Sequence, residues 1–501
     1  MDFLCSHPVL TCAEAKVWEG ALLRDEASEW SAMQRAGSAL AAAITEDYRE
    51  IGGLPESARL LVLAGKGHNG GDALLAAQAL LANRPLARVD VILAYGEAAL
   101  RPLARRALLG LCHEAGTQLR ETTLAELKRE LPGYDLCLDG VFGFQFHPPM
   151  DEATGELLAW VNTHPRIKLR AAVDLPSGVG EKNGGTDFRA DFTYATGIVK
   201  SPLVEEANAP LVGRLRYLDL GFFAQGSPSG AHAEVLRAEV LAPLARLRPA
   251  QTDKRTYGHL LVVGGSRSYP GAVLMTVQAA LRSGVGLLTA YVPASLVPEY
   301  AARLPEAMWV GVPETKDGGM SGALLTLVAQ KLSRASALAI GPGLGTDPVT
   351  LGAVQDLVQQ AALPMLLDAD ALRPEILAAA AGRRVIATPH VGEAVRIASA
   401  TGWLKDGVLV RKGSPTRVQA SERTCYSFFG GPVLARGGSG DLLSGIIGGL
   451  LAQGPDDLLL AACRGVVWHG LAADLLARDK GQVAVQTTQL LDYLQSALKC
   501  V

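Results

Sequence analysis

Residues 435–445, Ala-Arg-Gly-Gly-Ser-Gly-Asp-Leu-Leu-Ser-Gly, join a glycine-rich loop directly to the start of an apolar helix. Glycine lets backbone N–H groups approach an anion closely, and the N-terminus of a helix favours negative charge. The segment therefore predicts a phosphate cradle. Asp441 lies at the start of the expected helix, where it could cap the helix or accept the proton of a hydroxyl group that attacks phosphorus.

The same order of apolar run, glycine-rich turn and Ala/Leu-rich helical stretch recurs along the 501 residues. It predicts an α/β fold in which helices cover mainly parallel sheets. The order breaks at the turn-forming residues 221–230, where we place a linker. Because the two parts share no fixed-period repeat, we expect two different α/β domains, over residues 1–225 and 226–501.

Apolar runs bounded by turn formers predict the buried strands, and Ala/Leu-rich stretches predict the helices. Strands are expected at residues 59–64, 89–94, 135–138, 170–173, 259–263, 335–340, 364–367, 384–387 and 407–410. Helices are expected at residues 13–21, 29–48, 72–81, 271–283 and 441–452.

The composition is that of a globular protein with more than one core, since 49% of the residues are hydrophobic and 19% are charged. The formal net charge is −3, so no nucleic-acid or membrane-surface partner is expected. Residues 458–476 form the most apolar stretch, but Arg464, His469 and Asp474 interrupt it, and we expect no transmembrane span.

The seven cysteines form no C-x-x-C pair, which argues against a disulfide framework or a zinc site. The first ten residues contain no cationic region of the kind that opens a signal peptide. Reduced thiols and no signal peptide predict a cytoplasmic protein.

Several further clusters follow expected strands in the C-terminal half, at the sheet edge where ligands bind in such folds. Lys412 could hold a nucleotide phosphate or belong to a solvated turn. Asp368 and Asp370 could bind a metal or cap the next helix. His390 follows another strand, and the glycines of residues 341–345 lack the spacing of a dinucleotide fingerprint.

These clusters occur in a characteristic order. The ordered segments are Lys-Arg-Thr-Tyr-Gly-His at 254–259, Val-Val-Gly-Gly-Ser at 262–266, Tyr-Pro-Gly-Ala at 269–272, Ala-Leu-Arg-Ser-Gly-Val-Gly-Leu at 280–287, Gly-Pro-Gly-Leu-Gly at 341–345, Asp-Ala-Asp at 368–370, Thr-Pro-His-Val-Gly-Glu at 388–393, Lys-Gly at 412–413 and Gly-Gly-Ser-Gly-Asp at 437–441. Over residues 235–495 the chain resembles the ADP-dependent NAD(P)H-hydrate dehydratase domain, a ribokinase-like three-layer sandwich.

The resemblance implies that ADP, accompanied by Mg²⁺, phosphorylates the C6 hydroxyl of the S epimer of hydrated NAD(P)H. Loss of phosphate then restores NAD(P)H and leaves AMP. Asp441 would be the base that activates the hydroxyl. The hydrate would be bound by Ala272, Gly343, His390 and Asp441, and the nucleotide by Lys412, Gly413, Ser414, Pro415, Thr416 and Gly440.

The N-terminal half has a similar arrangement of strand, glycine-rich loop and helix at residues 61–72, Leu-Val-Leu-Ala-Gly-Lys-Gly-His-Asn-Gly-Gly-Asp. It predicts a second phosphate cradle, in which Asp72 could cap the helix. Asp139, Asp174 and Ser177 also lie at expected strand ends. Their convergence on one sheet edge predicts a site.

Together with Met-Gln-Arg-Ala-Gly at 33–37 and Lys200 after Thr-Gly-Ile-Val at 196–199, these segments resemble the NAD(P)H-hydrate epimerase domain over residues 9–222. The resemblance implies a Rossmann-like three-layer sandwich that interconverts the R and S hydrates. Asp174 would transfer the proton. The hydrate would be bound by His68, Asn69, Gly70, Gly71, Asp72 and Asp174, and K⁺ by the oxygen atoms of Asn69, Asp139 and Ser177.

Two departures from the epimerase pattern concern the binding loops. His68 stands where that pattern has Asn, and Ala73 where it has Gly. Residues 142–149, Phe-Gly-Phe-Gln-Phe-His-Pro-Pro, replace the usual Phe-Gly-Thr-Gly and bring bulk to the place of a phosphate. An active epimerase and a domain that keeps its fold but turns over slowly are both compatible with these changes.

The sequence therefore predicts a bifunctional nicotinamide-nucleotide repair enzyme that uses ADP or ATP and NAD(P)H hydrates and forms a homo-oligomer. A ribokinase-like small-molecule kinase and a nucleotide-binding scaffold are the alternatives. The fused N-terminal domain and the segment at residues 388–393 favour the repair enzyme.

Overall fold

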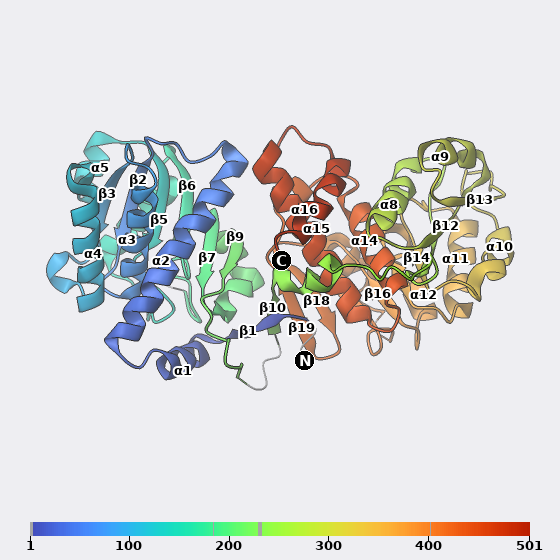
Figure 1. The fold of residues 1–501 in the computed structure, drawn as a ribbon, viewed down its shortest axis with the longest axis horizontal. Coiled ribbons are helices and arrows are strands. Elements are labelled where there is room, and N and C mark those ends of the chain that lie inside the picture. The colour runs from blue at the N-terminus through green and yellow to red at the C-terminus, as the bar shows by residue number, and fades with distance from the viewer. Residues whose placement is uncertain (1–3, 184, 229–232, 401) are drawn as a thin grey trace. The chain divides into compact units, whose positions relative to one another are not determined.

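The computed structural model describes residues 4–183, 185–228, 233–400 and 402–501 (Figure 1). The chain divides into two compact units, one of His7–Val235 and one of Leu236–Val501 together with Met1–Ser6. The expected linker precedes this division. Its residues 221–228 form no helix or strand, but Phe222 and Phe223 are buried in the N-terminal unit, and residues 229–230 lie outside the described residues.

The N-terminal unit contains a seven-stranded sheet in which every neighbouring pair is parallel. The strand order is β4 (Leu119–Glu121), β3 (Arg88–Leu93), β2 (Arg59–Ala64), β5 (Tyr134–Gly140), β6 (Ile167–Val173), β7 (Phe192–Thr196) and β9 (Arg214–Leu218). The main helices are α1 (Cys12–Leu22), α2 (Glu26–Tyr48), α3 (His68–Ala82), α4 (Pro102–Ala115), α5 (Leu124–Glu130), α6 (Glu152–Thr163) and α7 (Ala209–Val212).

Alternation along the strands produces three layers, because successive side chains of a strand point to opposite faces. Leu60 and Val62 of β2 pack with α2, α3 and α4. Leu61 and Leu63 of the same strand pack with α5 and α6. The unit is therefore the three-layer α/β sandwich that the sequence predicted.

A short parallel pair outside this sheet joins β1 (Ser6–Leu10) to β8 (Val199–Lys200). Leu10 is in register with Lys200. Thr11 then begins α1 with a capping box, in which its side chain and that of Glu14 satisfy each other's backbone N–H groups. Strand β1 thus leads into α1 without an intervening loop.

The C-terminal unit has a second, mainly parallel sheet. The order runs β13 (Met308–Val312), β12 (Leu287–Pro293), β11 (His259–Val263), β14 (Ala337–Ile340), β15 (Met365–Leu367), β16 (Val385–Ala387) and β17 (Val408–Arg411), followed by the antiparallel hairpin strands β18 (Thr416–Ala420) and β19 (Arg423–Ser427). Strand β10 spans Ala233–Leu236.

Helices cover both faces of this sheet as well. Leu260 and Val262 of β11 belong to the core with α8 (Pro270–Arg282), α14 (Ser439–Gln453), α15 (Leu458–Lys480) and α16 (Leu494–Leu498). Leu261 and Val263 belong to the core with α10 (Ala323–Leu332), α11 (Pro348–Gln360) and α12 (Pro374–Ala379). Two further helices are α9 (Val297–Arg303) and α13 (Val391–Ile397).

Close packing explains the glycines inside α14. A Cβ at Gly445 would lie 2.2 Å from the carbonyl oxygen of Thr276, and one at Gly449 would lie 1.9 Å from Oγ of Ser283. Both neighbours belong to α8 or its C-terminal end, so the small residues let the two helices approach.

Helix α15 is long and apolar enough to cross a membrane by length and composition alone. In the structure, 78% of its apolar window is buried, and it packs in the core of the C-terminal unit.

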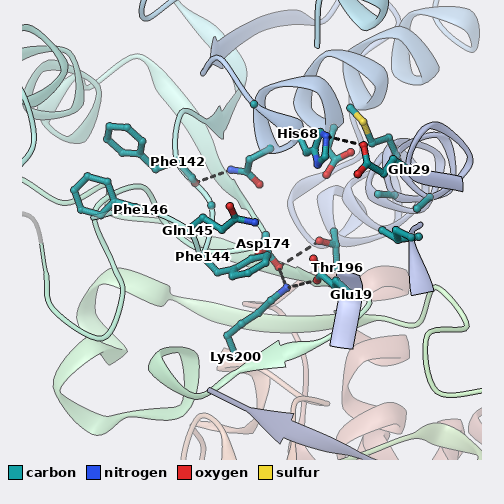
Figure 2. A pocket seen from close by; sticks show the side chains of 18 of the residues that line it. Glu19, Glu29, His68, Phe142, Phe144, Gln145, Phe146, Asp174, Thr196 and Lys200 are labelled. Carbon is teal, nitrogen blue, oxygen red and sulfur yellow. Dashed lines mark hydrogen bonds and ion pairs between the residues drawn. The ribbon is translucent and has the colours of Figure 1, made fainter. Parts of the chain in front are cut away.

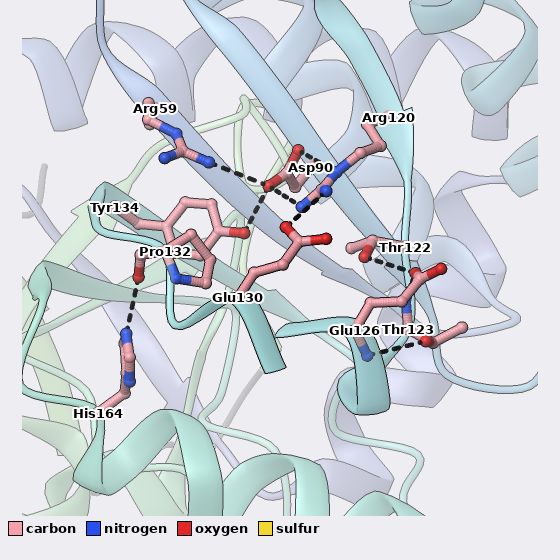
Figure 3. Close-up of polar contacts among 10 residues, drawn as sticks. All are labelled: Arg59, Asp90, Arg120, Thr122, Thr123, Glu126, Glu130, Pro132, Tyr134 and His164. Carbon is pink, nitrogen blue, oxygen red and sulfur yellow. Dashed lines mark hydrogen bonds and ion pairs between the residues drawn. The ribbon is translucent and has the colours of Figure 1, made fainter. Parts of the chain in front are cut away.

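Asp90 on β3 is a buried charge of the N-terminal sheet (Figure 3). Tyr134 donates to its Oδ2 at 2.5 Å, and Arg120 donates to both carboxylate oxygens, at 3.2 and 3.0 Å. Arg59 lies 3.6 Å from Oδ2. Burial, and then the hydrogen bond to the Asp90 carboxylate, raise the pKa of the Tyr134 phenol.

We predict that Asp90→Ala lowers the free energy of unfolding by about 1–3 kcal/mol, because Tyr134 loses its buried acceptor. Tyr134→Phe should cost about 1 kcal/mol, since Asp90 keeps its arginines. Urea denaturation of the full chain measures both. Lys128→Ala, which removes an exposed ion pair with Glu156, is the control and should change the value by less than about 0.5 kcal/mol.

Candidate active sites

The N-terminal unit has a cavity of about 240 Å³ at the carboxyl ends of its strands (Figure 2). The loops after β2 and β5 form one side of it, and Asp174, Thr196 and Lys200 form another. Glu19 of α1 and Glu29 of α2 complete the wall. Because carboxyl ends of parallel strands lie along one edge, the sheet collects these polar groups in one place.

The glycine-rich loop is packed so tightly that side chains are excluded. A Cβ at Gly65 would lie 1.9 Å from the carbonyl oxygen of Val141, and one at Gly70 would lie 2.2 Å from that of Gly65. A Cβ at Gly71 would lie 2.2 Å from Cε of Met33. Gly70 and Gly71 are therefore buried supports behind the cavity wall, whereas His68, Asn69 and Asp72 line it.

Helix α3 begins at His68, four residues earlier than expected, with Gly67 in the N-cap position. Asp72 is the fifth residue of the helix, so the capping alternative for Asp72 is wrong. Its Oδ1 is buried and has no hydrogen-bond partner among the described residues. Burial, followed by the charges of Asp174 and Glu19, raises the pKa of Asp72 well above its ordinary value.

The three predicted potassium ligands belong to one network. Ser177 donates from Oγ to Oδ1 of Asp139 at 2.6 Å and from its N–H to Oδ2 at 2.7 Å. Asn69 donates to the carbonyl oxygen of Phe142 at 2.6 Å, while the N–H of Phe142 donates to Oγ of Ser177 at 2.8 Å. Burial raises the pKa of Asp139 to about 6, and its hydrogen bonds from Ser177 oppose the increase.

A buried ion pair lies at the base of the cavity. Lys200 donates to Oδ1 of Asp174 at 2.6 Å, and Oγ1 of Thr196 donates to the same oxygen at 3.3 Å. Oε1 of Glu19 lies 3.6 Å from Nζ of Lys200. Burial lowers the pKa of Lys200, but Asp174 and Glu19 outweigh it, so the pKa is raised and the ammonium stays charged.

The loop after β5 brings aromatic bulk to the cavity, as the sequence predicted. The rings of Phe142 and Phe146 lie 4.4 Å apart, and Nζ of Lys200 lies 4.8 Å from the centre of the Phe144 ring. All three rings line the cavity (Figure 2). Of the three, the Phe144 ring lies beside the ion pair.

The second site lies at the carboxyl ends of β11, β14, β15, β16 and β17, which are neighbours in the C-terminal sheet. Gly343 has a φ of 69°, and a Cβ there would lie 2.5 Å from the carbonyl oxygen of Tyr269 and 3.1 Å from Cβ of Ala272. Ala272 and Gly343, two residues predicted to bind the hydrate, are therefore adjacent.

Asp368 is the buried centre of this site. Lys412 donates to its Oδ1 at 2.9 Å, and Ser444 of α14 donates to its Oδ2 at 2.6 Å. A Cβ on Gly440 would lie 3.2 Å from Nζ of Lys412, so the lysine lies directly beside the first turn of α14. Burial would raise the pKa of Asp368, but the charge of Lys412 together with hydrogen bonds, including that from Ser444, outweighs it and the pKa is lowered.

Asp441 is the third residue of α14 and does not cap it. Gly438 is the N-cap residue, with a φ of 89°, and no side chain in the described part of the chain provides a capping hydrogen bond. Burial, and then the neighbouring carboxylate of Asp368, raise the pKa of Asp441 to about 6, against the opposing charge of Lys412. Asp441 is therefore suited to accept a proton near neutral pH.

His390 has a capping role. Its Nδ1 accepts from the N–H groups of Gly392 and Glu393 at 3.0 and 3.3 Å, while Glu393 accepts from the N–H of His390. Asp370 accepts from the N–H of Gly345 at 2.9 Å. Within the described part of the chain, neither Asp368 nor Asp370 caps the next helical segment with its side chain, so the capping alternative for this acidic pair is not observed.

The remaining predicted nucleotide residues, Gly413, Ser414, Pro415 and Thr416, connect β17 to β18, and Thr416 closes the turn by donating to the carbonyl oxygen of Gly413 at 3.1 Å. Sequence reasoning missed Ser444 and Glu19. Ser444 lies three residues after Asp441, on the same helix face, and that spacing was the available signal.

Comparison with known proteins gives two family matches. Residues 260–496 match the family described as NAD(P)H-hydrate dehydratase, and residues 30–201 match the one described as YjeF-related protein N-terminus. The bifunctional NAD(P)H-hydrate repair enzyme Nnr of Gloeobacter violaceus is 36% identical and aligns over 95% of each chain. That of Moorella thermoacetica is 33% identical, over 93% of this chain and 92% of the other.

Two solved structures are similar to part of the chain. A ribokinase-like superfamily protein of Enterococcus faecalis is 25% identical, covers 55% of this chain and 99% of its own, and gives a TM-score of 0.47. The ADP/ATP-dependent NAD(P)H-hydrate dehydratase of Bacillus subtilis, co-crystallised with ATP/Mg²⁺, is 29% identical, covers 53% of this chain and 97% of its own, and gives 0.44.

We predict that Lys412→Met lowers the free energy of unfolding at pH 7 by about 3 kcal/mol, because it leaves the Asp368 carboxylate buried without its cation. With the lysine present, the lowered pKa of Asp368 keeps the carboxylate ionised down to pH 4. Without the lysine that pKa is higher, so in the variant Asp368 takes up a proton as the pH falls and its buried charge is lost. The difference between variant and parent should therefore shrink from pH 7 to pH 4.

Urea titrations at the two pH values measure the Lys412 effect. Lys405→Met, at an exposed lysine of the same unit, is the matched control and should leave both values unchanged. A loss of stability for Lys412→Met that is equal at both pH values would contradict the assigned charge pair.

Proposed function

The chain belongs to the bifunctional NAD(P)H-hydrate repair enzymes, and we propose that it restores hydrated NAD(P)H in two successive steps. The epimerase interconverts the R and S hydrates, and the dehydratase converts the S hydrate to NAD(P)H while ADP becomes AMP and phosphate. The observation that carries this proposal is the presence of both matched segments in one chain that aligns with bifunctional relatives over nearly its full length. We assign the two activities to residues 1–225 and 226–501.

In the dehydratase, Asp441 takes the proton of the C6 hydroxyl as its oxygen bonds to the terminal phosphorus of ADP, and AMP leaves. The C6–O bond then breaks, phosphate departs with the electron pair, and loss of a proton from the adjacent ring carbon restores the double bond. Lys412, held by Asp368 beside Gly440, offsets the phosphate charge. Ala272, Gly343 and His390 bind the hydrate, and residues 413–416 bind the nucleotide, which Mg²⁺ accompanies.

In the epimerase, the hydrate lies in the 240 Å³ cavity, bounded by His68, Asn69 and Asp72, with Gly70 and Gly71 holding the loop. Asp174 exchanges a proton with the reacting ring. The orphaned Oδ1 of Asp72 is an acceptor for a hydroxyl or amide group of the substrate.

A potassium ion suits the network of Asn69, Asp139 and Ser177. The Asp139 carboxylate is fully buried, and its hydrogen-bond donors, from Ser177 and Val141, are neutral. Oxygen atoms are the ligands that a hard cation prefers. K⁺ would offset the buried negative charge and fix the loop after β5.

We further propose that the protein is a cytoplasmic homo-oligomer. The aromatic loop supports one alternative, a dehydratase whose epimerase is slow, since Phe144 and Phe146 occupy part of the cavity wall.

We predict that Asp441→Asn lowers the dehydratase rate by about 10²- to 10⁴-fold, because the general base is lost, while ADP still binds. The parent enzyme should lose activity as the pH falls through about 6, where Asp441 gains a proton. Initial rates from pH 5 to 8 with S hydrate, and calorimetric ADP binding, measure both. Full activity of the variant would remove Asp441 from the mechanism.

We predict that the parent enzyme converts a mixture of the R and S epimers of NADH hydrate completely to NADH in the presence of ADP, Mg²⁺ and K⁺. The near-ultraviolet absorbance of NADH measures the recovery. Recovery that stops at the S fraction would favour the slow-epimerase alternative. Formation of a stable phosphorylated product from ATP would instead indicate a kinase. Replacing K⁺ by tetramethylammonium should slow only the recovery of NADH from the R epimer.

A further inference from the structure

The cavity of the N-terminal unit holds more acid groups than the proposed epimerase mechanism uses. Glu19, Asp72 and Asp174 all line it, and Lys200 is the cation that contacts two of them. Glu19 lies on α1, far along the chain from the other residues of the site. Its closeness to Lys200 calls for an explanation.

The local structure fixes Glu19 at this place. Strand β1 pairs with β8 so that Leu10 is in register with Lys200, and the capping box at Thr11 starts α1 immediately afterwards. Trp18 on α1 donates from Nε1 to the carbonyl oxygen of Phe222 at 3.1 Å and stacks on Phe223. Two independent contacts therefore hold the helix that presents Glu19 to the cavity.

The two carboxylates on either side of Lys200 differ in their surroundings. Asp174 receives hydrogen bonds at 2.6 Å from Lys200 and at 3.3 Å from Thr196. Glu19 lies 3.6 Å from the same ammonium. Burial raises the pKa of Glu19 more than Lys200 lowers it, so Glu19 keeps its proton to a higher pH than an ordinary glutamate does.

Epimerisation at a carbon that bears a hydroxyl group and a ring nitrogen needs an acid and a base. The hydroxyl oxygen takes a proton, the C6–O bond breaks as water leaves, and the nitrogen lone pair forms a C6=N bond. Water then adds to the other face, and its extra proton passes to a carboxylate. Two acidic groups with different pKa values can catalyse both directions, because the group that donates a proton in one direction accepts it in the other.

We propose that Glu19 is a second catalytic acid–base residue of the epimerase, that it exchanges its proton with the C6 hydroxyl while Asp174 serves the opposite face, and that Lys200 positions both carboxylates. This proposal rests on the epimerase activity proposed above. Figure 2 shows the three side chains together at the base of the cavity.

The test compares the parent enzyme with Glu19→Gln on purified R hydrate, with epimerisation to the S form followed by chromatography. We expect the rate constant at saturation to fall about 100-fold or more, with a smaller change in KM, because the amide keeps the shape but carries no exchangeable acid proton. Glu19→Asp should recover part of the rate.

The pH dependence of the epimerase rate distinguishes a catalytic role of Glu19 from a purely structural one. Glu19 faces Lys200, Asp174 and Asp72, and the thiol of Cys12 lies near Lys200. The parent rate should fall on the alkaline side as Glu19 loses its proton, and this limb should be absent in Glu19→Gln. Lys200→Met should move the alkaline limb to higher pH, because Glu19 loses the ammonium that lowers its pKa.

Two controls complete the test. Glu26→Gln, at an exposed acid of the neighbouring helix, should leave the epimerase rate unchanged. Turnover of S hydrate with ADP reports on the folded C-terminal unit, and the thermal unfolding midpoint of each variant reports on the whole chain.

The outcomes are distinct. An active parent with Glu19→Gln at full rate, or with an unchanged alkaline limb, would overturn the role of Glu19 and leave the epimerase assignment intact. A parent that does not exceed the spontaneous epimerisation rate would overturn both.

Discussion

The contact between Lys412 and Asp368 keeps two charges together at the carboxyl edge of the C-terminal sheet, where neither would be stable alone. It sets the position of the ammonium beside Gly440, lowers the pKa of one carboxylate and, through that carboxylate, raises the pKa of Asp441. The N-terminal unit uses the same device, with Lys200 on Asp174. In both units a lysine paired with a buried carboxylate therefore acts on the pKa of an acid beside it, since Lys412 lowers that of Asp368 and Lys200 opposes the rise of that of Glu19.

The sequence predicted the elements whose local pattern agrees with their environment. Strands β2 and β11 have the expected bounds, because each is a continuous apolar run buried on both faces. The sequence places the start of α3 four residues too late, because His-Asn-Gly-Gly has low helix propensity. Gly65 lies close to Gly70, and Met33 lies close to Gly71, so both helix positions need glycine. These contacts exist only in the folded unit.

The same contrast holds for the candidate sites: residues placed by a local pattern could be predicted, and residues placed by tertiary contacts could not. Residues at strand ends, such as Asp174 and Asp368, could be found because parallel strands bring their carboxyl ends to one edge. Glu19 could not be found, since its position depends on the register of β1 with β8, which no local pattern specifies. A sequence motif also cannot tell a binding residue from a helix cap. The His390 side chain belongs to a motif, and in the structure it accepts hydrogen bonds from backbone N–H groups at the start of α13.

The short β1–α1 segment has a consequence for how this unit can be divided. All seven strands of the parallel sheet, and both helical layers that cover it, come from residues after α1. A chain trimmed to begin at α2 would retain that scaffold and lose Glu19 and the strand that pairs with β8. The parallel-sheet scaffold and the complete cavity are therefore formed by different lengths of polypeptide, and the difference lies on the N-terminal side of α2.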